Sequence, residues 1–549
     1  MCRTQERKDE LLRMTSDEAH HTDDEGRLTC KLLMLVVALA FGTWFPIGFA
    51  MGIVNAPQRE IIHWIRQVKC QRLGETPEPA AAGIIVNGSA VGDTNVLCNR
   101  TVAAFSEDAD DVTLWCSNID GTSQADLLAS NTELNTIWAL VASLMPLGSC
   151  ITVWFMNYLI NTHGSKKTLL FTNIFGIVGA VLSGICRLVA SFEVLIVGRI
   201  IIGMNIGLAI AIVPLYVAEI SPSNLRGMMG TIPGLFLVTG TLIANIFGLR
   251  ELLGTTEWWP YLSFVLLVPY FSLWGTLPFF PESPRFLLIN KRDQKSAKKA
   301  LVWLRDKSDV TGEIKMILTE RDHDGDTPEG ISITGFFGNA LLRSTVFLSC
   351  IIILSQQLTG IGAFLVYSTG IFTAAGLPES DAIWGTVGLM GLQIIAVLAA
   401  LLLMDRAGRK ILLVIGYAGA VLTNGTMVGA MTYATEEHPG AQYISIGCVL
   451  VFMIVYNLGP AFVPWILVSE MFEKRTSGVA MMVVSTCSHL AGIAIVFLFP
   501  ILHAAMDEWV FAAFAVCSGL FALFVWSHAV ETKGKTFEEI QTELHSRYK

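Results

Sequence analysis

Two adjacent amide side chains, Gln356 and Gln357, stand within an apolar stretch of the sequence that runs from 342 to 372. Each amide can both donate and accept hydrogen bonds, so the pair could hold a neutral ligand that is rich in hydroxyl groups. An unpaired amide facing lipid would be costly, and we therefore expect both side chains to face the interior of the protein. Tyr367, about one turn of chain beyond a run of glycines in the same stretch, is a candidate aromatic gate.

Six charged residues form a second candidate functional set. They lie in the short polar segments between apolar stretches. We expect these residues to form a network of ion pairs between two halves of the protein, although a solvated charged rim is the alternative interpretation. An exposed pair contributes only about 0–1 kcal/mol, but a protein with two states needs only a few kcal/mol to favour one of them. The set comprises Glu219, Arg226, Arg406, Arg409, Glu470 and Arg475.

The elements that position these residues are long apolar stretches, because 53% of the residues are hydrophobic and only 15% are charged. A helix needs about 20 apolar residues to cross a bilayer, and twelve stretches reach that length. A large soluble helical protein would not place so much continuous apolar surface outside one packed core. The sequence therefore predicts an all-α membrane protein. The predicted spans are 32–54, 134–158, 168–190, 194–218, 228–249, 258–280, 342–372, 383–404, 411–433, 443–469, 477–503 and 508–530.

The distribution of charge predicts how the chain crosses the membrane. Lysine and arginine are concentrated in the loops on one side, and acidic residues in the short loops on the other, so the positive-inside rule places both termini in the cytoplasm. The first 27 residues are polar and lack the apolar core of a signal peptide. We expect a cytoplasmic N-tail, two six-helix bundles joined by a cytoplasmic linker with short helices, and a cytoplasmic C-tail. Their predicted ranges are 1–31, 32–280, 281–341, 342–530 and 531–549.

The long loop between the first two spans, 55–133, is predicted to be extracellular. It contains two N-glycosylation motifs, at Asn87 and Asn99, which we expect to carry glycans. It also contains Cys70, Cys98 and Cys116, and an extracellular loop permits a disulfide between two of them with one thiol left free. The sequence does not reveal which two would pair.

Similar motifs recur at equivalent places in the two halves of the chain. Three pairs of motifs match in order: Asn161–Lys167 with Asp405–Lys410, Pro214–Gly227 with Pro464–Arg475, and Pro281–Arg285 with Val530–Gly534. Such matches predict that a unit of six spans is duplicated in parallel. Two bundles of this kind form the major facilitator fold, in which the substrate site lies between the halves near the middle of the membrane.

Within that superfamily the chain resembles the facilitative glucose transporters from about residue 31 to 540. The resemblance rests on motifs that occur together and in order. They are Val54–Gln58, Gly198–Arg199, Pro214–Gly227, Pro281–Leu288, Gln356–Gly360, Asp405–Arg409, Gly459–Pro460 with Pro464–Trp465, and Val530–Phe537. The resemblance implies facilitated transport of a hexose, most simply D-glucose, by alternating access in the plasma membrane, with the charged set closing the inner gate. Independently of the resemblance, the glycine and proline breaks at 360–362 and 459–464 free backbone groups that are tolerated where they line a cavity, so we expect these segments to be gating helices; ordinary glycine and proline of membrane helices are the alternative interpretation.

The same resemblance implies which residues line the sugar site. Gln356 and Gln357 match the paired sugar-binding glutamines of the family, and Trp465 matches its tryptophan. The other positions expected to line the site are Gln393, Asn457, Tyr367 and Thr486. Several positions depart from the family pattern and put the identity of the sugar in doubt: Ala50, Gly234, Gly362, Val366 and Cys487. Fructose, a polyol or dehydroascorbate are therefore alternative substrates.

The mode of energy coupling is predicted from residue types in the spans. Proton symporters of this fold carry an acid in the first span, where this chain has Ala50, and no acid lies in the middle of any predicted span. Arg199 resembles a structural arginine of the family, and His489 is the one titratable residue that leaves proton coupling as a less favoured alternative. We predict uniport without metal, cofactor, nucleic acid or catalytic residues. The expected partners are a sugar and the lipid bilayer, a monomer should suffice, and a non-transporting nutrient sensor is the rival class.

Overall fold

The computed structural model describes residues 28–72, 134, 136–222, 225–324, 333–374, 377–433, 440–472, 474–533, 535 and 537–547. Eleven helices in these ranges are long and apolar enough to cross a membrane. A bent pair, Thr136–Ser143 and Met145–Val153, forms a twelfth span with an angle of 40°. The prediction of twelve spans is confirmed, and each observed span lies within a few residues of its predicted range. Asn87, Asn99, Cys98 and Cys116 lie outside the described residues, as does the side chain of Cys70.

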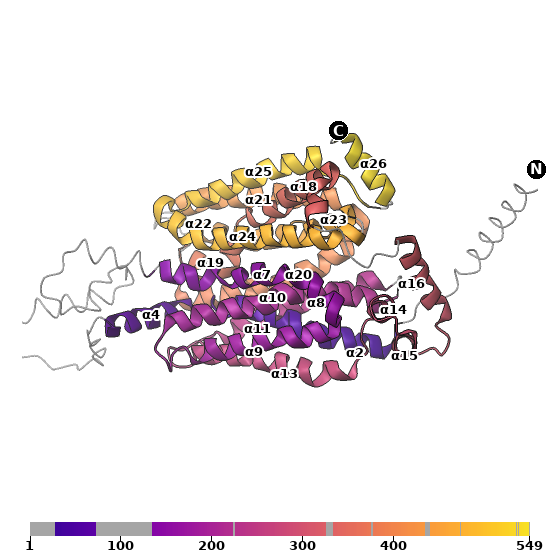
Figure 1. Cartoon of the computed structure of the whole chain (residues 1–549). Coiled ribbons are helices and arrows are strands. Elements are labelled where there is room, and N and C mark those ends of the chain that lie inside the picture. The colour runs from indigo at the N-terminus through magenta and orange to yellow at the C-terminus, as the bar shows by residue number, and fades with distance from the viewer. Residues whose placement is uncertain are drawn as a thin grey trace, which may run out of the picture.

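The first six spans pack into an N-terminal half, and Figure 1 shows it below the C-terminal half. Proline and aromatic residues interrupt the first and sixth spans, which are each built from consecutive short helices. The helices of this half are α2 (Cys30–Leu39), η2 (Ala40–Trp44), α3 (Phe45–Gly52), α7 (Met145–Val153), α9 (Ser165–Ile185), α10 (Phe192–Ile220), α11 (Arg226–Phe247), η4 (Trp259–Tyr261), α12 (Leu262–Val265) and α13 (Leu267–Thr276).

The last six spans form the C-terminal half. Two of them are broken where the sequence has glycine and proline: α18 ends at Gln357 before Gly360, whose φ is +91°, and α22 ends at Leu458 before Pro460. The seventh and tenth spans thus have the breaks expected of them. The helices of this half are α18 (Ala340–Gln357), α19 (Ile361–Ala374), α20 (Glu379–Ala407), α21 (Arg409–Thr432), α22 (Gly440–Leu458), α23 (Val463–Met471), α24 (Lys474–Met506) and α25 (Trp509–His528).

The remaining helices lie at the two ends of the bundles and define two sides of the molecule (Figure 1). Short helices lie at one end, which we call the linker side. Two belong to the N-terminal half: α8 (Met156–His163), between the second and third spans, and η5 (Leu277–Phe279), at the end of the sixth. The others lie between the halves or after the last span; they are α14 (Pro284–Ile289), α15 (Gln294–Arg305), α16 (Thr311–Asp324), α17 (Ile333–Gly338) and α26 (Phe537–Arg547). The other end, which we call the α4 side, carries α4 (Gln58–Arg72). Helix α15 is amphipathic and buries Ala297, Leu301 and Leu304.

The two halves pack together along α7 with α24 and along α11 with α20. The apolar core is continuous across both halves toward the α4 side, where Phe49 and Trp64 share one cluster with Phe364 and Phe511. On the linker side there are two further clusters, one around Tyr216 in the N-terminal half and one around Tyr417 in the C-terminal half, and Val153 of α7 packs into the second. In a bilayer, close van der Waals packing and hydrogen bonds between helices hold the spans together. The halves therefore share an apolar core on the α4 side, and they also touch on the linker side, where Nδ2 of Asn157 in α8 lies 3.8 Å from the sulfur of Met482 in α24.

Candidate functional site

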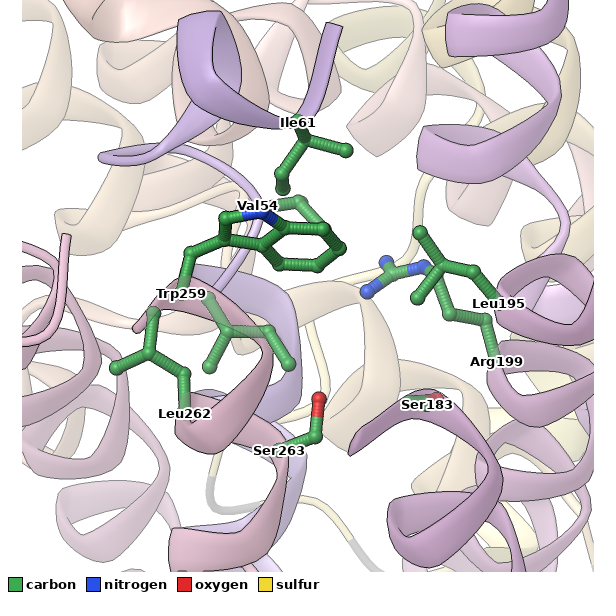
Figure 2. Close-up of a pocket in the computed structure, with 9 residues that line it drawn as sticks. Val54, Ile61, Ser183, Leu195, Arg199, Trp259, Leu262 and Ser263 are labelled. Carbon is green, nitrogen blue, oxygen red and sulfur yellow. The ribbon is translucent and has the colours of Figure 1, made fainter. Parts of the chain in front are cut away.

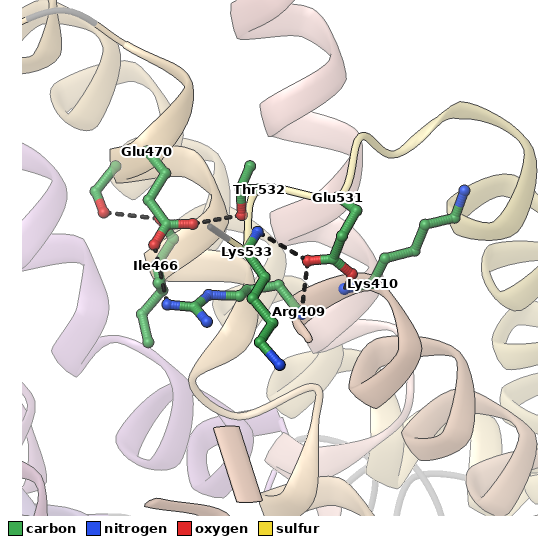
Figure 3. A network of polar contacts seen from close by, with 8 residues as sticks. Arg409, Lys410, Ile466, Glu470, Glu531, Thr532 and Lys533 are labelled. Carbon is green, nitrogen blue, oxygen red and sulfur yellow. Dashed lines mark hydrogen bonds and ion pairs between the residues drawn. The ribbon is translucent and has the colours of Figure 1, made fainter. Parts of the chain in front are cut away.

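Glycine turns and carboxylates are repeated at the linker-side ends of two spans. Gly164 precedes α9 and Gly408 precedes α21, with φ values of +84° and +88°. In the C-terminal half, Glu531 accepts hydrogen bonds of 3.0 Å from the backbone N–H groups of Arg409 and Lys410 (Figure 3). These N–H groups have no partner within the helix, and the helix dipole favours a negative charge there. Glu531 therefore caps α21.

The N-terminal half carries the same arrangement. The Oε1 atom of Glu282 accepts hydrogen bonds of 3.0 Å from the backbone N–H groups of Lys166 and Ser283, so Glu282 caps α9 as Glu531 caps α21. Burial raises the pKa of the Glu282 carboxyl above its ordinary value, and the two backbone donors oppose that rise. The duplication inferred from the sequence motifs thus extends to individual hydrogen bonds.

The glycine turns can be tested by adding one methyl group. At Gly408 the Cβ of an alanine would lie 2.9 Å from Oε2 of Glu531, and φ is +88° with ψ near 152°, a region that glycine alone occupies readily. We expect Gly408→Ala to lower the free energy of unfolding by about 1–3 kcal/mol. Thermal unfolding of the purified protein would measure the loss. Gly312→Ala is the matched control, because its added Cβ meets no atom within 4 Å; an equal loss there would contradict the prediction.

The charged residues predicted to form a network divide between the two halves. Arg409 lies 3.3 Å from Oε1 of Glu470, whose Oε2 accepts a hydrogen bond from the hydroxyl of Thr532 (Figure 3). Glu219 is hydrogen-bonded to Ser283 of its own half. Arg226 begins α11 and is exposed, and the side chains of Arg406 and Arg475 lie outside the described residues. The structure thus brings Arg409 and Glu470 together within the C-terminal half.

The paired glutamines lie where α18 ends and connect three spans. Nε2 of Gln356 donates a 2.7 Å hydrogen bond to the carbonyl of Ala461, which lies in the break between α22 and α23. Nε2 of Gln357 lies 3.3 Å from the hydroxyl of Ser488 in α24. Both amides face protein rather than lipid, as expected from their cost in lipid. Both bonds use Nε2 as the donor, and Gln356 is also hydrogen-bonded to the hydroxyl of Tyr456.

The other residues predicted to line the site occupy the same half. Asn457 is buried near the end of α22 and donates 2.8 Å to the carbonyl of Met453, one turn earlier. Gln393 of α20 is buried, and its Oε1 has no hydrogen-bond partner among the described residues. Trp465 of α23 is half-buried. A buried amide oxygen without a donor can accept a hydrogen bond from a ligand hydroxyl or from water. Gln393 is therefore a strong candidate for contact with a ligand.

Tyr367 and Thr486 are held by backbone carbonyls of the C-terminal half. The hydroxyl of Tyr367 donates 3.2 Å to the carbonyl of Val496, so this predicted gate residue connects α19 with α24. Its φ and ψ of −116° and 15° mark a kink within α19. Thr486 is half-buried and donates to the carbonyl of Met482, four residues earlier in the same helix. Tyr367 is therefore positioned at a bend, which is where a gating helix would move.

The positions that depart from the family pattern have specific neighbours. A Cβ on Gly234 would lie 3.4 Å from the ring of Phe462, so this glycine of α11 faces the break between α22 and α23 across the interface of the two halves. A Cβ on Gly362 would lie 3.0 Å from Val496. The carbonyl of Ala50 accepts a 3.3 Å hydrogen bond from Nη1 of Arg199. The two remaining departures, Val366 and Cys487, are half-buried.

Asn55, which directly follows the first span, makes polar contacts between the halves that sequence reasoning missed. Its Nδ2 donates 2.8 Å to the hydroxyl of Ser368 and 3.1 Å to the carbonyl of Leu365, and Oδ1 lies 3.5 Å from the hydroxyl of Thr369. Asn55 is fully buried on the α4 side. We call this set the Asn55 latch. An isolated asparagine next to a proline motif gives no sign of partners 310 residues away, so only the packing of the halves reveals it.

His489, the residue that left proton coupling open, is bonded within its own helix. Its Nδ1 lies 2.6 Å from the carbonyl of Ser485, one turn earlier in α24. A ring nitrogen that donates to a carbonyl is held in one tautomer and orientation. The polar ring of His489, in the middle of a span, thus has a hydrogen-bond partner within its own helix.

Comparisons with known proteins show the family and the fold of the chain. A family model described as "Sugar (and other) transporter" matches residues 35–544. The sheep (Ovis aries) protein named solute carrier family 2, facilitated glucose transporter member 5, is 31% identical over 516 residues, which are 94% of this chain and 92% of that protein. The dog (Canis lupus familiaris) facilitated glucose transporter member 3 is 34% identical over 417 residues, covering 76% of this chain and 83% of that protein.

Solved structures with the same fold include a proton:xylose symporter, XylE, bound to 6-bromo-6-deoxy-D-glucose. It has a TM-score of 0.68 and 19% sequence identity, covering 93% of this chain and 98% of the symporter. The partially occluded inward-open form of XylE from E. coli has a TM-score of 0.67 and 17% identity, with 92% of this chain and all of that chain covered. These likenesses establish the major facilitator fold with two bundles of six spans.

Proposed function

Because the chain belongs to the sugar transporter family of membrane carriers, we propose that it carries a hexose, with D-glucose as the first candidate, down its concentration gradient. The observation that carries this proposal is the pair Gln356–Gln357, which lies at the break between α18 and α19 and contacts helix α24 and the break between α22 and α23. Amides at a helix break offer the mixed donors and acceptors that sugar hydroxyls need.

Transport would follow from rocking of the two halves about the substrate site. The state described here is joined on the α4 side through the Asn55 latch. The complementary state would close the linker side, where Arg409 and Glu470 of one half could meet Glu219 and Arg226 of the other. We infer from the positive-inside rule that the linker side and both termini are cytoplasmic. The two N-glycosylation motifs of the 55–133 loop support action in the plasma membrane, and a monomer would suffice.

The alternative substrate class is another small neutral solute, such as fructose, a polyol or dehydroascorbate. It is favoured by Gly234 and Gly362, which stand where the family pattern has amides and so remove donors from the site. Uptake of labelled D-glucose into proteoliposomes, with each of these solutes as competitor, separates the two. Strong competition by unlabelled D-glucose alone supports glucose, whereas stronger competition by another solute would assign that solute as substrate.

Restoring one amide tests whether the departures set the substrate preference. Gly234 faces Phe462 at a distance that leaves ordinary van der Waals room for a Cβ, so Gly234→Gln can place an amide at the interface of the halves. We expect the variant to raise the affinity for D-glucose about 5- to 10-fold, because one net hydrogen bond contributes about 1 kcal/mol. Gly234→Leu, which has similar bulk without hydrogen bonding, is the matched control. An equal effect of both variants on KM would reject the explanation.

A further inference from the structure

A small pocket lies inside the N-terminal half toward the α4 side, apart from the paired glutamines (Figure 2). Its volume is about 10 Å³, which is room for about one water-sized species. The guanidinium group of Arg199 and the hydroxyl of Ser263 point toward its middle, and the indole ring of Trp259 forms a wall (Figure 2). Ile53, Leu195 and Leu262 provide apolar lining. The pocket is therefore a small space with a positive charge at its edge.

Hydrogen-bond donors without acceptors are concentrated around this pocket. Arg199 is only 2% exposed, and its Nη1 reaches the carbonyl of Ala50. Its Nε, the hydroxyl of Ser183 and Nε1 of Trp259 are buried, and none of them has a hydrogen-bond partner in the part of the chain that the structure describes. Guanidinium and indole groups can only donate hydrogen bonds. A bound species that accepts hydrogen bonds would therefore provide the acceptors that these buried donors lack.

Among the described residues, the acidic side chains of the helices around the pocket do not pair with Arg199. Glu60 of α4 pairs with Arg250 at 3.6 Å and accepts a hydrogen bond from Thr256. Glu193, at the start of α10, pairs with Arg72 at 2.5 Å. Both carboxylates are thus engaged with other partners. A buried cation without a counter-charge is costly in a membrane protein, which favours recruitment of a negative ion.

We propose that this pocket binds a small monovalent inorganic anion, such as chloride, which neutralises Arg199 and accepts hydrogen bonds from the surrounding donors. The size of the pocket excludes larger anions such as phosphate. The ion would take the place of a carboxylate beside Arg199 and stabilise the packing of α3, α9, α10 and α12. This inference goes beyond sugar transport, because it concerns stability and does not depend on which solute is carried.

Thermal unfolding of the full-length purified protein in sodium chloride and in sodium methanesulfonate, at equal ionic strength, tests the proposal. An ion that binds only the folded protein raises Tm as its concentration passes its Kd. We expect Tm to be a few degrees higher in chloride, with a saturable dependence. Bromide should substitute and give an anomalous scattering peak beside Arg199. Equal Tm values in the two salts, with no bromide peak, would mean that water alone occupies the pocket and would overturn the proposal.

A charge placed inside the pocket distinguishes this site from a chloride site elsewhere on the protein. Ser263→Asp puts a carboxylate next to Arg199, and we expect its Tm to be independent of chloride and at least as high in methanesulfonate as that of the wild type in chloride. Ser263→Ala, which adds no charge at the same position, should keep the chloride dependence. A chloride response that persists unchanged in Ser263→Asp would overturn the assignment to this pocket.

Discussion

Replacing Gln356 with leucine is expected to reduce sugar uptake by roughly 10- to 100-fold while the protein remains folded. The variant removes an amide that contacts Ala461 and leaves a sugar hydroxyl without a partner. An unsatisfied buried polar group costs about 1–3 kcal/mol, and each 1.4 kcal/mol is a factor of ten in affinity. Initial rates of labelled D-glucose uptake into proteoliposomes, normalised to reconstituted protein, would measure the effect.

Ser349→Ala is the matched control for this variant. Ser349 is fully buried in the same helix, α18, but its hydroxyl donates 2.8 Å to the carbonyl of Thr345, four residues earlier in that helix. Its removal should leave uptake within about twofold of the wild type, because a single hydrogen bond within a helix contributes only about 1 kcal/mol to folding. Equal activity of Gln356→Leu and wild type would remove this glutamine from the substrate site.

Replacing Asn55 with alanine is expected to shift the balance between the two conformational states by about 10- to 100-fold. The variant removes the polar contacts of Asn55 with Leu365, Ser368 and Thr369, which join the halves on the α4 side. A loss of about 1.5–3 kcal/mol from one state alone changes the population ratio by that factor. The variant should therefore populate the state closed on the linker side much more strongly than the wild type does.

Distances between spin labels on the linker side would measure this shift. Thr162 of α8 and Ser469 of α23 are both exposed and lie in opposite halves, so cysteines at these positions can carry the labels in a background without other accessible cysteines. We expect the short-distance population to grow in Asn55→Ala. Ser368→Ala, which loses only one of the contacts, should give a smaller change in the same direction. An unchanged distance distribution in Asn55→Ala would show that the latch does not stabilise this state.

The sequence was sufficient for much of the fold. Hydropathy located the spans to within a few residues, because crossing a bilayer requires a fixed length of apolar helix. Glycine and proline marked the breaks after Gln357 and Leu458 correctly, since Pro460 lacks an N–H and Gly360 adopts a positive φ. The cost of burying amides in lipid correctly placed Gln356 and Gln357 against protein. These features depend on the residue types within each segment, which can be read from the sequence.

Features that depend on how helices pack could not be predicted in this way. The sequence motifs contained Glu282 and Glu531, but their role as helix caps required knowing that the loop after the last span of each half returns to the start of the third span of that half. The approach of Phe462 to Gly234 and the Asn55 latch both arise at the interface of the halves. The sequence also does not predict on which side of the molecule the two halves share an apolar core. The charge pattern is compatible with contact on the α4 side or on the linker side.

Uptake of labelled D-glucose into proteoliposomes, with and without an imposed proton gradient, tests the central claim most directly. Uniport predicts saturable uptake that ends when the inside and outside concentrations are equal and that is the same with the gradient as without it. The absence of acidic residues from the middle of the spans and the helix-bonded state of His489 lead to this expectation. Accumulation of sugar above the outside concentration, driven by the gradient, would contradict it.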